Sequence, residues 1–281
     1  MSKTWFITGA SSGIGRIATE RLLVRGDRVV ATVRRVDALS ELERAHGDRL
    51  TTLRLDLTDK AAVSSTIDDA FARAGRIDVV VSNAGYGLFG AAEEVTSEQI
   101  DRQIATNLMG PIELIRSAIP HLRRQGGGRI VQVSSEGGQI AYPNFSLYHA
   151  TKWGVEGFIE AVAQEVRPFG IDFIIAEPGP TATNFGAGLD RASEMTVYDD
   201  TPAGAVRRAI ADGSFVVRGD AARTVDAIIA AADMATPPFR LVLGGSAYEA
   251  ITAALEKRLA EARGQRSVAY SADRDTSAVD A

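Results

Sequence analysis

The sequence predicts an α/β fold: one doubly wound parallel sheet of seven strands, with helices on both faces. Short apolar runs alternate with helical patterns from residue 4 to about residue 263, as in chains built from repeated strand–helix units. A glycine-rich turn directly follows the first apolar run, where such folds bind nucleotides. The 281 residues are enough for one domain of about 250, which we place at residues 1–263.

The expected elements follow from the period of the apolar residues. Runs rich in Val, Ile and Thr predict strands at 4–8, 28–33, 50–55, 78–82, 129–134, 171–176 and 239–243. Apolar residues three or four positions apart predict helices at 14–25, 37–46, 59–75, 97–124, 146–167, 220–234 and 246–263. Residues 264–281 lack periodicity and are rich in Ser, Asp and Arg, so we expect a disordered tail there.

The first turn has the sequence Gly9-Ala10-Ser11-Ser12-Gly13-Ile14-Gly15 between a strand and a helix. Without Cβ atoms, its backbone N–H groups and the helix dipole can face a pyrophosphate. Its spacing, Gly-x-x-x-Gly-x-Gly, differs from the common dinucleotide fingerprint. A tight connection without a ligand is the alternative, and the strand–turn–helix context favours the nucleotide.

Tyr148 and Lys152 are four residues apart, and Ser135 lies thirteen residues before Tyr148. On a helix this spacing places the phenol and the ammonium on one face, where the cation lowers the pKa of the phenol. Such a phenol can exchange a proton with a carbonyl or alcohol oxygen that a nearby serine orients. An isolated Tyr-x-x-x-Lys is more often a solvated helix face, so the interpretation depends on the preceding motifs.

Together these motifs resemble the short-chain dehydrogenase/reductase family over about residues 4–245, with a Rossmann-like fold. Asn83-Ala84-Gly85 matches the family's Asn-Ala-Gly element, and Pro178-Gly179 matches its Pro-Gly segment. The resemblance implies a catalytic tetrad of Asn107, Ser135, Tyr148 and Lys152. The cofactor contacts that it implies are Gly9, Ser11, Ser12, Gly13, Ile14, Gly15, Arg34, Arg35, Asp56, Leu57, Asn83, Ala84, Gly85, Tyr148, Lys152, Pro178, Gly179, Thr181 and Thr183.

Cofactor preference depends on the end of the second strand, where NAD-binding sites place a carboxylate on the ribose hydroxyls. Here Arg34 and Arg35 occupy that turn, and we expect Asp37 to cap the next helix. Because an arginine suits a 2′-phosphate, NADP(H) is favoured and NAD(H) stays possible. A solvated arginine pair is the alternative. Asp56 is expected at the adenine amino group, or else as a helix cap.

Residues 181–217 interrupt the alternation, and by the resemblance they form a mobile lid over the substrate; a plain surface loop is the alternative. The expected substrate contacts are Ser135, Gln139, Phe145, Tyr148 and Phe185, which are mostly aromatic. They indicate an uncharged carbonyl compound of moderate size. The pattern after Asn83 is most similar to the hydroxysteroid and retinol dehydrogenase branch.

Composition excludes several functions. There is no cysteine, and His46, His121 and His149 show no ligand spacing, so we expect no metal. The net charge of −5 gives no footprint for nucleic acid. Without a leader or a long apolar run we expect a cytoplasmic protein with no membrane partner. By the resemblance it forms a homodimer or homotetramer.

These inferences predict an NADP-dependent oxidoreductase that transfers hydride between nicotinamide and a carbonyl or secondary alcohol. An NAD-preferring alcohol dehydrogenase of the same family is the first alternative. A nucleotide-sensing regulatory protein on this scaffold is the second, although such proteins typically lack part of the Ser–Tyr–Lys set, which this chain keeps.

Overall fold

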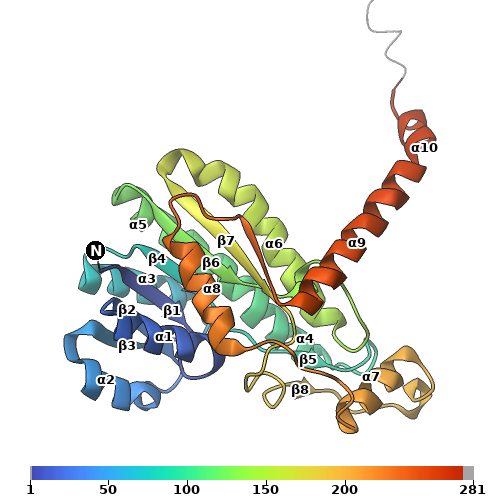
Figure 1. Ribbon diagram of the computed structural model, residues 1–281, viewed down its shortest axis with the longest axis horizontal. Coiled ribbons are helices and arrows are strands. Elements are labelled where there is room, and N and C mark those ends of the chain that lie inside the picture. The colour runs from blue at the N-terminus through green and yellow to red at the C-terminus, as the bar shows by residue number, and fades with distance from the viewer. Residues whose placement is uncertain (1, 275–281) are drawn as a thin grey trace, which may run out of the picture.

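A computed structural model describes residues 2–274 of the chain. Seven parallel strands form one sheet in the order β3-β2-β1-β4-β6-β7-β9 (Figure 1). They are β1 (Thr4–Thr8), β2 (Arg28–Val33), β3 (Leu50–Arg54), β4 (Val79–Ser82), β6 (Gly128–Val133), β7 (Ile171–Pro178) and β9 (Arg240–Leu243). The predicted fold class and all seven strands are confirmed. The order reverses between β1 and β4, so a crevice for a ligand is expected at their carboxyl ends.

Helices cover both faces of the sheet because alternate side chains of each strand point to opposite sides. They are α1 (Gly13–Arg25), α2 (Ser40–His46), α3 (Lys60–Ala74), α4 (Ser97–Ile104), α5 (Gly110–Arg124), α6 (Ser146–Val166), α7 (Pro202–Ala211), α8 (Ala221–Asp233), α9 (Gly245–Gly264) and α10 (Arg266–Ser271). All seven helices expected from periodicity are present, within a few residues of the predicted ends.

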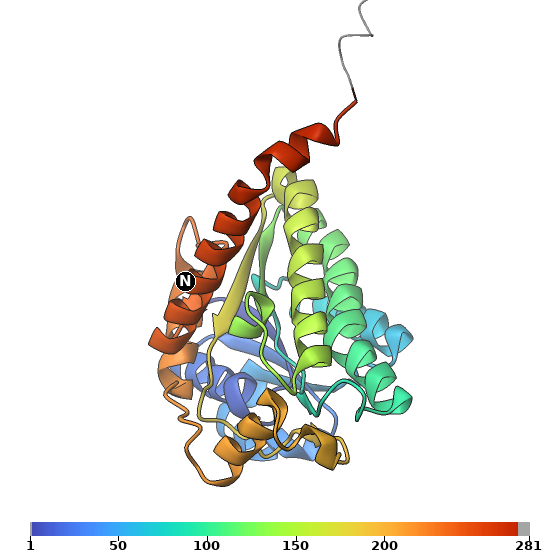
Figure 2. The same cartoon turned by 90° about the vertical axis from the view of Figure 1, so that its right-hand side faces the viewer.

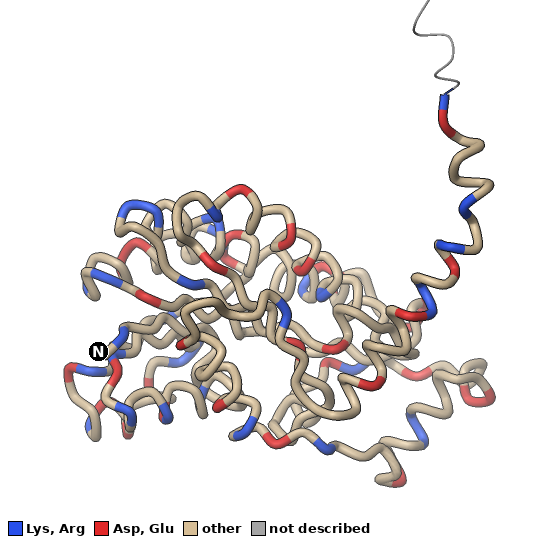
Figure 3. Tube along the Cα trace, turned by 45° about the horizontal axis from the view of Figure 1, so that its top comes forward, with Lys and Arg blue, Asp and Glu red and all other residues tan. Residues whose placement is uncertain are grey.

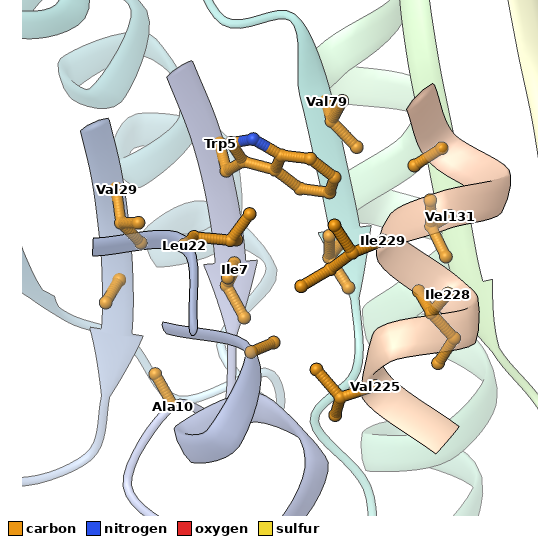
Figure 4. Close-up of a cluster of buried hydrophobic side chains, with 14 of the residues drawn as sticks. Trp5, Ile7, Ala10, Leu22, Val29, Val79, Val131, Val225, Ile228 and Ile229 are labelled. Carbon is orange, nitrogen blue, oxygen red and sulfur yellow. The ribbon is translucent and has the colours of Figure 1, made fainter. Parts of the chain in front are cut away.

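The strand β1 shows the division between the two cores. Trp5 and Ile7 face one side and pack with Leu22 of α1 and Ile228 of α8 (Figure 4). Phe6, between them, faces the other side and packs against α3, α5 and α6. All of these side chains are buried. The sheet is therefore covered on both faces, which makes its carboxyl edge the accessible place for a site.

The segment 181–217 has more structure than its sequence suggests. Its short strand β8 (Asp190–Arg191) pairs in parallel with β5 (Leu88–Phe89), and α7 follows. Asp190 also forms an ion pair with Arg102 of α4. The segment is thus attached to the body at several points, and its mobility stays a prediction.

The C-terminal region departs from the prediction of a disordered tail after Gly264. The helix α10 continues almost directly from α9, and together they project from the body (Figure 2). The prediction is wrong for these residues, because Gln265, Arg266 and Ala269 are good helix formers and the helix needs no apolar period. Residues 275–281, part of the same prediction, lie outside the described residues.

Acidic and basic residues are interspersed over the surface of the described chain (Figure 3). Among residues 2–274, no helix combines the length and the apolar character that crossing a membrane requires.

Candidate active site

The glycine-rich turn is shaped for close approach of a ligand to the backbone. Gly9 and Gly13 have φ values of 68° and 55°, in the left-handed region that favours glycine. A Cβ on Gly15 would lie 2.5 Å from the carbonyl oxygen of Gly9. The helix α1 begins here, and its N-cap Ser12 makes no side-chain cap hydrogen bond. Its first N–H groups therefore fit an anion such as a pyrophosphate.

The turn is held from behind by the loop after β4. The hydroxyl of Thr8 accepts hydrogen bonds from the backbone N–H groups of Asn83, at 2.9 Å, and of Ala84, at 3.0 Å. The side-chain amide of Asn83 donates to the Thr8 carbonyl at 2.8 Å. Asn83 thus positions the turn. Gly85 lies beside Asn107, whose Oδ1 would be 3.2 Å from a Cβ on Gly85.

The predicted cofactor residues after β7 lie opposite the same turn. A Cβ on Gly13 would be 3.7 Å from Cβ of Thr183, so the two segments face each other across a narrow gap. Thr181 bridges to Gly219, and its hydroxyl donates to the carbonyl of Gly179 at 2.8 Å. The structure brings these residues, with Pro178 at the end of β7, to the edge of the sheet where β1 ends.

At the end of β2 the two arginines differ. Arg35 is paired with Asp37, at 2.7 Å, so Asp37 does not cap α2 as predicted. Arg34 is exposed and forms no ion pair with any residue between 2 and 274. The Asp56 carboxylate accepts hydrogen bonds from the backbone N–H of Thr58, at 3.0 Å, and from its hydroxyl, at 2.8 Å. These two hydrogen bonds lower the pKa of Asp56.

The Asp56 carboxylate and the Arg34 guanidinium are close enough to interact electrostatically. Leu57, next in the chain, is buried, and Ile14 packs against the core. Both side chains thus anchor the backbone of the cofactor-binding turns to the core. Ser11 and Ser12 are both exposed. The sequence thus located the elements of the site, while the separation of Arg34 from the Arg35–Asp37 pair required the structure.

Tyr148, Lys152 and Ser135 come together in the interior. Tyr148 and Lys152 lie one turn apart on α6, both 7% exposed, with Lys152 Nζ 5.5 Å from the centre of the Tyr148 ring. Ser135 follows β6; its Oγ accepts from the Gly137 N–H at 3.0 Å, and its interaction with the phenol acts to lower the pKa of Tyr148. Lys152 Nζ donates to the carbonyl of Val133 at 3.0 Å, which fixes its position. The phenol and the ammonium thus share one face of α6, as the spacing predicts, and their catalytic role stays a prediction.

The predicted pKa shift of Tyr148 is wrong. Burial raises the pKa of the phenol to about 12, although its interaction with Ser135 acts in the opposite direction. Burial also lowers the pKa of Lys152 to about 8, with the charge of Glu156 opposing this. Desolvation is the largest cause of both pKa shifts, because the phenol and the ammonium are both buried away from water. At neutral pH the phenol holds its proton and can donate it.

Asn107 lies where the helix 97–124 is interrupted. Residues Ala105–Met109 form a π-helical turn between α4 and α5. The Asn107 side chain accepts from the Tyr86 N–H at 3.1 Å and donates to the Tyr86 carbonyl at 2.7 Å. The helix expected over 97–124 is therefore interrupted at Asn107, and these two hydrogen bonds fix the Asn107 side chain there.

The expected substrate residues separate into two groups. The rings of Phe145 and Phe185 lie 6.0 Å and 5.7 Å from the Tyr148 ring, so they form an aromatic wall around the phenol. Gln139 is different: its amide donates to the buried carboxylate of Glu156 at 2.5 Å. That hydrogen bond engages the amide of the half-buried Gln139, and a contact with substrate stays a prediction.

Sequence reasoning missed Glu156, which supports the Ser135 loop. Glu156 is 2% exposed and accepts hydrogen bonds from Ser134, Gln139 and Arg240. Because Ser134 and Gln139 flank Ser135, one carboxylate fixes both ends of that loop to α6. The four-residue spacing from Lys152 could have predicted this, because it places Glu156 on the same face of the helix.

Sequence reasoning also missed a buried ion pair between Glu94 and Arg207, which attaches α7 to the body. The Glu94 carboxylate accepts from the N–H groups of Ala91 and Met195, both at 2.7 Å. Burial opposes its ionisation, yet these bonds and Arg207 hold the pKa of Glu94 below its ordinary value. No local pattern predicts this pair, because its members are 113 residues apart.

A resident metal has no support in the part of the chain that the structure describes. No group of three or more His, Cys, Asp or Glu side chains there is arranged to hold an ion. His149 is structural: its Nε2 accepts from Tyr142 N–H at 3.2 Å, so its Nδ1 donates to the Gly137 carbonyl at 2.9 Å.

A glycine-rich turn at a helix N-terminus, beside a buried Ser–Tyr–Lys group, defines a dinucleotide-dependent oxidoreductase. Comparison with known proteins agrees. The family model described as short chain dehydrogenase matches residues 3–194. Oxidoreductase BOA17 of Botryotinia fuckeliana is 34% identical over 250 residues, which cover 89% of this chain and 91% of that protein.

Solved structures give the same result. A short-chain dehydrogenase from Streptomyces avermitilis superposes with a TM-score of 0.88 at 38% identity, covering 97% of this chain and 98% of that one. A metagenomic short-chain oxidoreductase in complex with NADP has a TM-score of 0.68 at 26% identity, covering 86% and 96%. The chain belongs to the short-chain dehydrogenase/reductase family, and it is an NAD(P)-dependent oxidoreductase acting on small molecules.

Proposed function

We propose that the protein is an NADP-dependent carbonyl reductase or alcohol dehydrogenase whose substrate is largely apolar and of moderate size. The observation that carries the proposal is the buried Tyr148 phenol, with Ser135 as a polar partner and aromatic rings around it. The Tyr148 and Ser135 hydroxyls, surrounded by aromatic rings, suit a substrate with one carbonyl or hydroxyl group on an otherwise apolar molecule. The hydroxysteroid and retinol dehydrogenase branch stays a proposal on the same grounds.

The residues of the chain have separate tasks in this mechanism. The nicotinamide cofactor, when bound, supplies or accepts hydride. Tyr148 donates its proton to the carbonyl oxygen in reduction, which its neutral form at pH 7 allows. Ser135 orients that oxygen, and Lys152 holds the cofactor ribose from its fixed position beside the Val133 carbonyl. Asn107, at the π-helical turn, completes the route by which the proton is replaced.

The preference for NADP rests on Arg34. Its guanidinium is exposed at the end of β2, where a 2′-phosphate is expected, while Asp37 is occupied by Arg35. A charge-assisted hydrogen bond contributes roughly 1.5–3 kcal/mol, or about 10- to 150-fold in affinity. The NADP complex of the metagenomic relative supports this preference. An NAD-preferring enzyme is the alternative, with Asp56 as a carboxylate close enough to Arg34 to interact with its charge.

The phenol is tested by Tyr148→Phe, which keeps the ring and deletes the proton. A panel of ketones and alcohols, followed by NADPH absorbance, first gives a substrate. Turnover by the variant should then fall by at least ~10²-fold with cofactor affinity nearly unchanged. Tyr142→Phe removes a neighbouring hydroxyl as the matched control and should keep most of the activity. Equal turnover by wild type and Tyr148→Phe would contradict the assignment.

The cofactor preference is tested by titrating NADPH and NADH into the wild type and into Arg34→Asp. Wild type should bind NADPH more tightly by about 10- to 150-fold. Arg34→Asp should reverse the order, because it removes the donor and installs a ribose acceptor. The exposed Arg35→Asp serves as the comparison and should have a smaller effect. Tighter NADH binding by the wild type would overturn the proposal.

A further inference from the structure

Glu136, the residue after Ser135, has a buried carboxyl group without a partner in the chain. Glu136 is 6% exposed. Its carboxyl forms no hydrogen bond or ion pair with any residue from 2 to 274, and burial alone raises the pKa of Glu136. Buried carboxyl groups in proteins normally have hydrogen-bond partners, because their desolvation is otherwise costly. This one is therefore suited to a partner that comes from outside the chain.

The short 3-10 helix Glu136–Gly138 directs this carboxyl away from α6. A Cβ on Gly137 would lie 2.7 Å from Nδ1 of His149, and a Cβ on Gly138 would overlap the carboxylate of Glu156. Both glycines thus pack directly against side chains of α6 and leave no room for side chains of their own. Glu136 is the one residue of this turn whose side chain reaches the end of β7.

The carboxyl lies at the same edge of the sheet as the catalytic phenol. The strands β6, β7 and β9 are neighbours, and Glu136, Gly179 and Ser246 follow their carboxyl ends. A Cβ on Gly179 would lie 3.2 Å from Oε2 of Glu136 and 3.4 Å from Oγ of Ser246. The charge of Glu136 acts on the phenols of both Tyr148 and Tyr142. Glu136 and the phenol of Tyr148 therefore face the same part of the site.

We propose that Glu136 selects substrates that carry a hydroxyl group at a second position, away from the carbonyl or alcohol that reacts at Tyr148. The inference rests on the proposed oxidoreductase function and names its substrate class, hydroxy ketones and the corresponding diols. A hydroxyl can donate to the carboxylate or accept from the protonated carboxyl, so it pairs with Glu136 in either state. The rest of the substrate stays apolar, as the rings of Phe145 and Phe185 favour.

Paired ketones test this contact. Cyclohexanone and decalone are each compared with their monohydroxylated isomers, which vary the distance between the two oxygens. Wild type should use at least one hydroxy ketone with a kcat/KM at least ~10-fold above that of its parent ketone. Glu136→Leu should lose this preference and keep its activity on the parent ketone, and Glu136→Gln, which retains an acceptor, should keep part of the preference. Glu249→Gln, at an exposed acid of α9, is the matched control and should behave as wild type.

An anionic ketone gives a readout of opposite sign. Oxocyclohexanecarboxylate carries a carboxylate in place of the hydroxyl, so the wild type should use it poorly because of like-charge repulsion. Both Glu136→Gln and Glu136→Leu should use it at least ~10-fold better than wild type, whereas Glu249→Gln should not. An unchanged kcat/KM for this ketone in both Glu136 variants would contradict a contact between substrate and carboxyl.

The stability of the ligand-free protein separates this role from a structural one. Removing a buried carboxyl without partners should leave the free energy of unfolding unchanged or raise it, whereas a structural group would lower it. Turnover of the parent ketones without a preference for any hydroxy ketone would overturn the inference and leave the proposed function standing. An equal loss on every ketone, with weaker NADPH binding, would assign Glu136 to the cofactor and also overturn it. No turnover of any ketone or alcohol would contradict the proposed function, and this inference with it.

Discussion

Two groups of charges, one under the lid segment and one under the Ser135 loop, are built differently. Under the lid segment, the buried Glu94 pairs with the buried Arg207, whose second acid is the exposed Asp199 at 4.0 Å. Under the Ser135 loop, Arg240 alone faces Glu156, Glu160 and Glu177. Among the buried side chains the first group is balanced, with one acid and one base, whereas the second has two acids, Glu156 and Glu177, for one base.

The imbalance appears in the pKa values. The pKa of Glu94 is lowered despite its burial, because two N–H groups and Arg207 stabilise the anion. Burial, together with the charge of Glu156, raises the pKa of Glu177 to about 7. A balanced buried pair thus stays ionised and serves to fix the segment, while an acid-rich cluster keeps one carboxyl that titrates near neutral pH.

The largest effect should come from breaking the balanced pair. Arg207→Ala leaves Glu94 buried without a counter-charge, which we expect to cost about 3–5 kcal/mol of stability. Thermal unfolding measures this, and hydrogen exchange should speed up across residues 187–212. Arg208→Ala, at the exposed neighbouring position, is the control and should change little. Wild-type exchange in Arg207→Ala would show that the pair does not hold the segment.

A smaller effect should come from relieving the acid-rich cluster with Glu177→Gln. The folded pKa of about 7 exceeds the ordinary 4.5, so the unfolded chain releases this proton first. Wild-type stability should therefore fall, by about 2–3 kcal/mol, as pH rises from 4.5 to 7. Denaturant titrations across this range should show a flatter dependence in Glu177→Gln. Glu160→Gln removes only the smallest of the charges that raise the pKa of Glu177, so it should keep most of the wild-type slope. A slope shared by all three proteins would refute the titration of Glu177.

The smallest effect should distinguish the two adjacent serines. Ser134→Ala removes one donor to Glu156, whose carboxylate keeps Gln139 and Arg240, so we expect a loss of about 1 kcal/mol of stability. Turnover should change little. Ser135→Ala should lower turnover by a much larger factor with nearly wild-type stability. Equal losses of turnover in both variants would mean that Ser134 also positions the substrate.

The same distinction explains how much of the protein was predictable. Period-two and helical patterns located the elements around Tyr148, and the positions after each strand located the site, because parallel strands end at one edge. Four-residue spacing brought Tyr148 and Lys152 together. Local patterns do not report burial, so the direction of the Tyr148 pKa shift was predicted wrongly.

The sequence by itself determined whatever depends on neighbours along the chain: the strand and helix periods, the glycine-rich turn and the order of the motifs. The tertiary structure decided which distant groups meet. It paired Glu94 with Arg207, turned Gln139 toward Glu156 and left Arg34 apart from Arg35 and Asp37. The physical reason is that desolvation and charge pairing depend on what surrounds a group in space, which residue spacing does not encode.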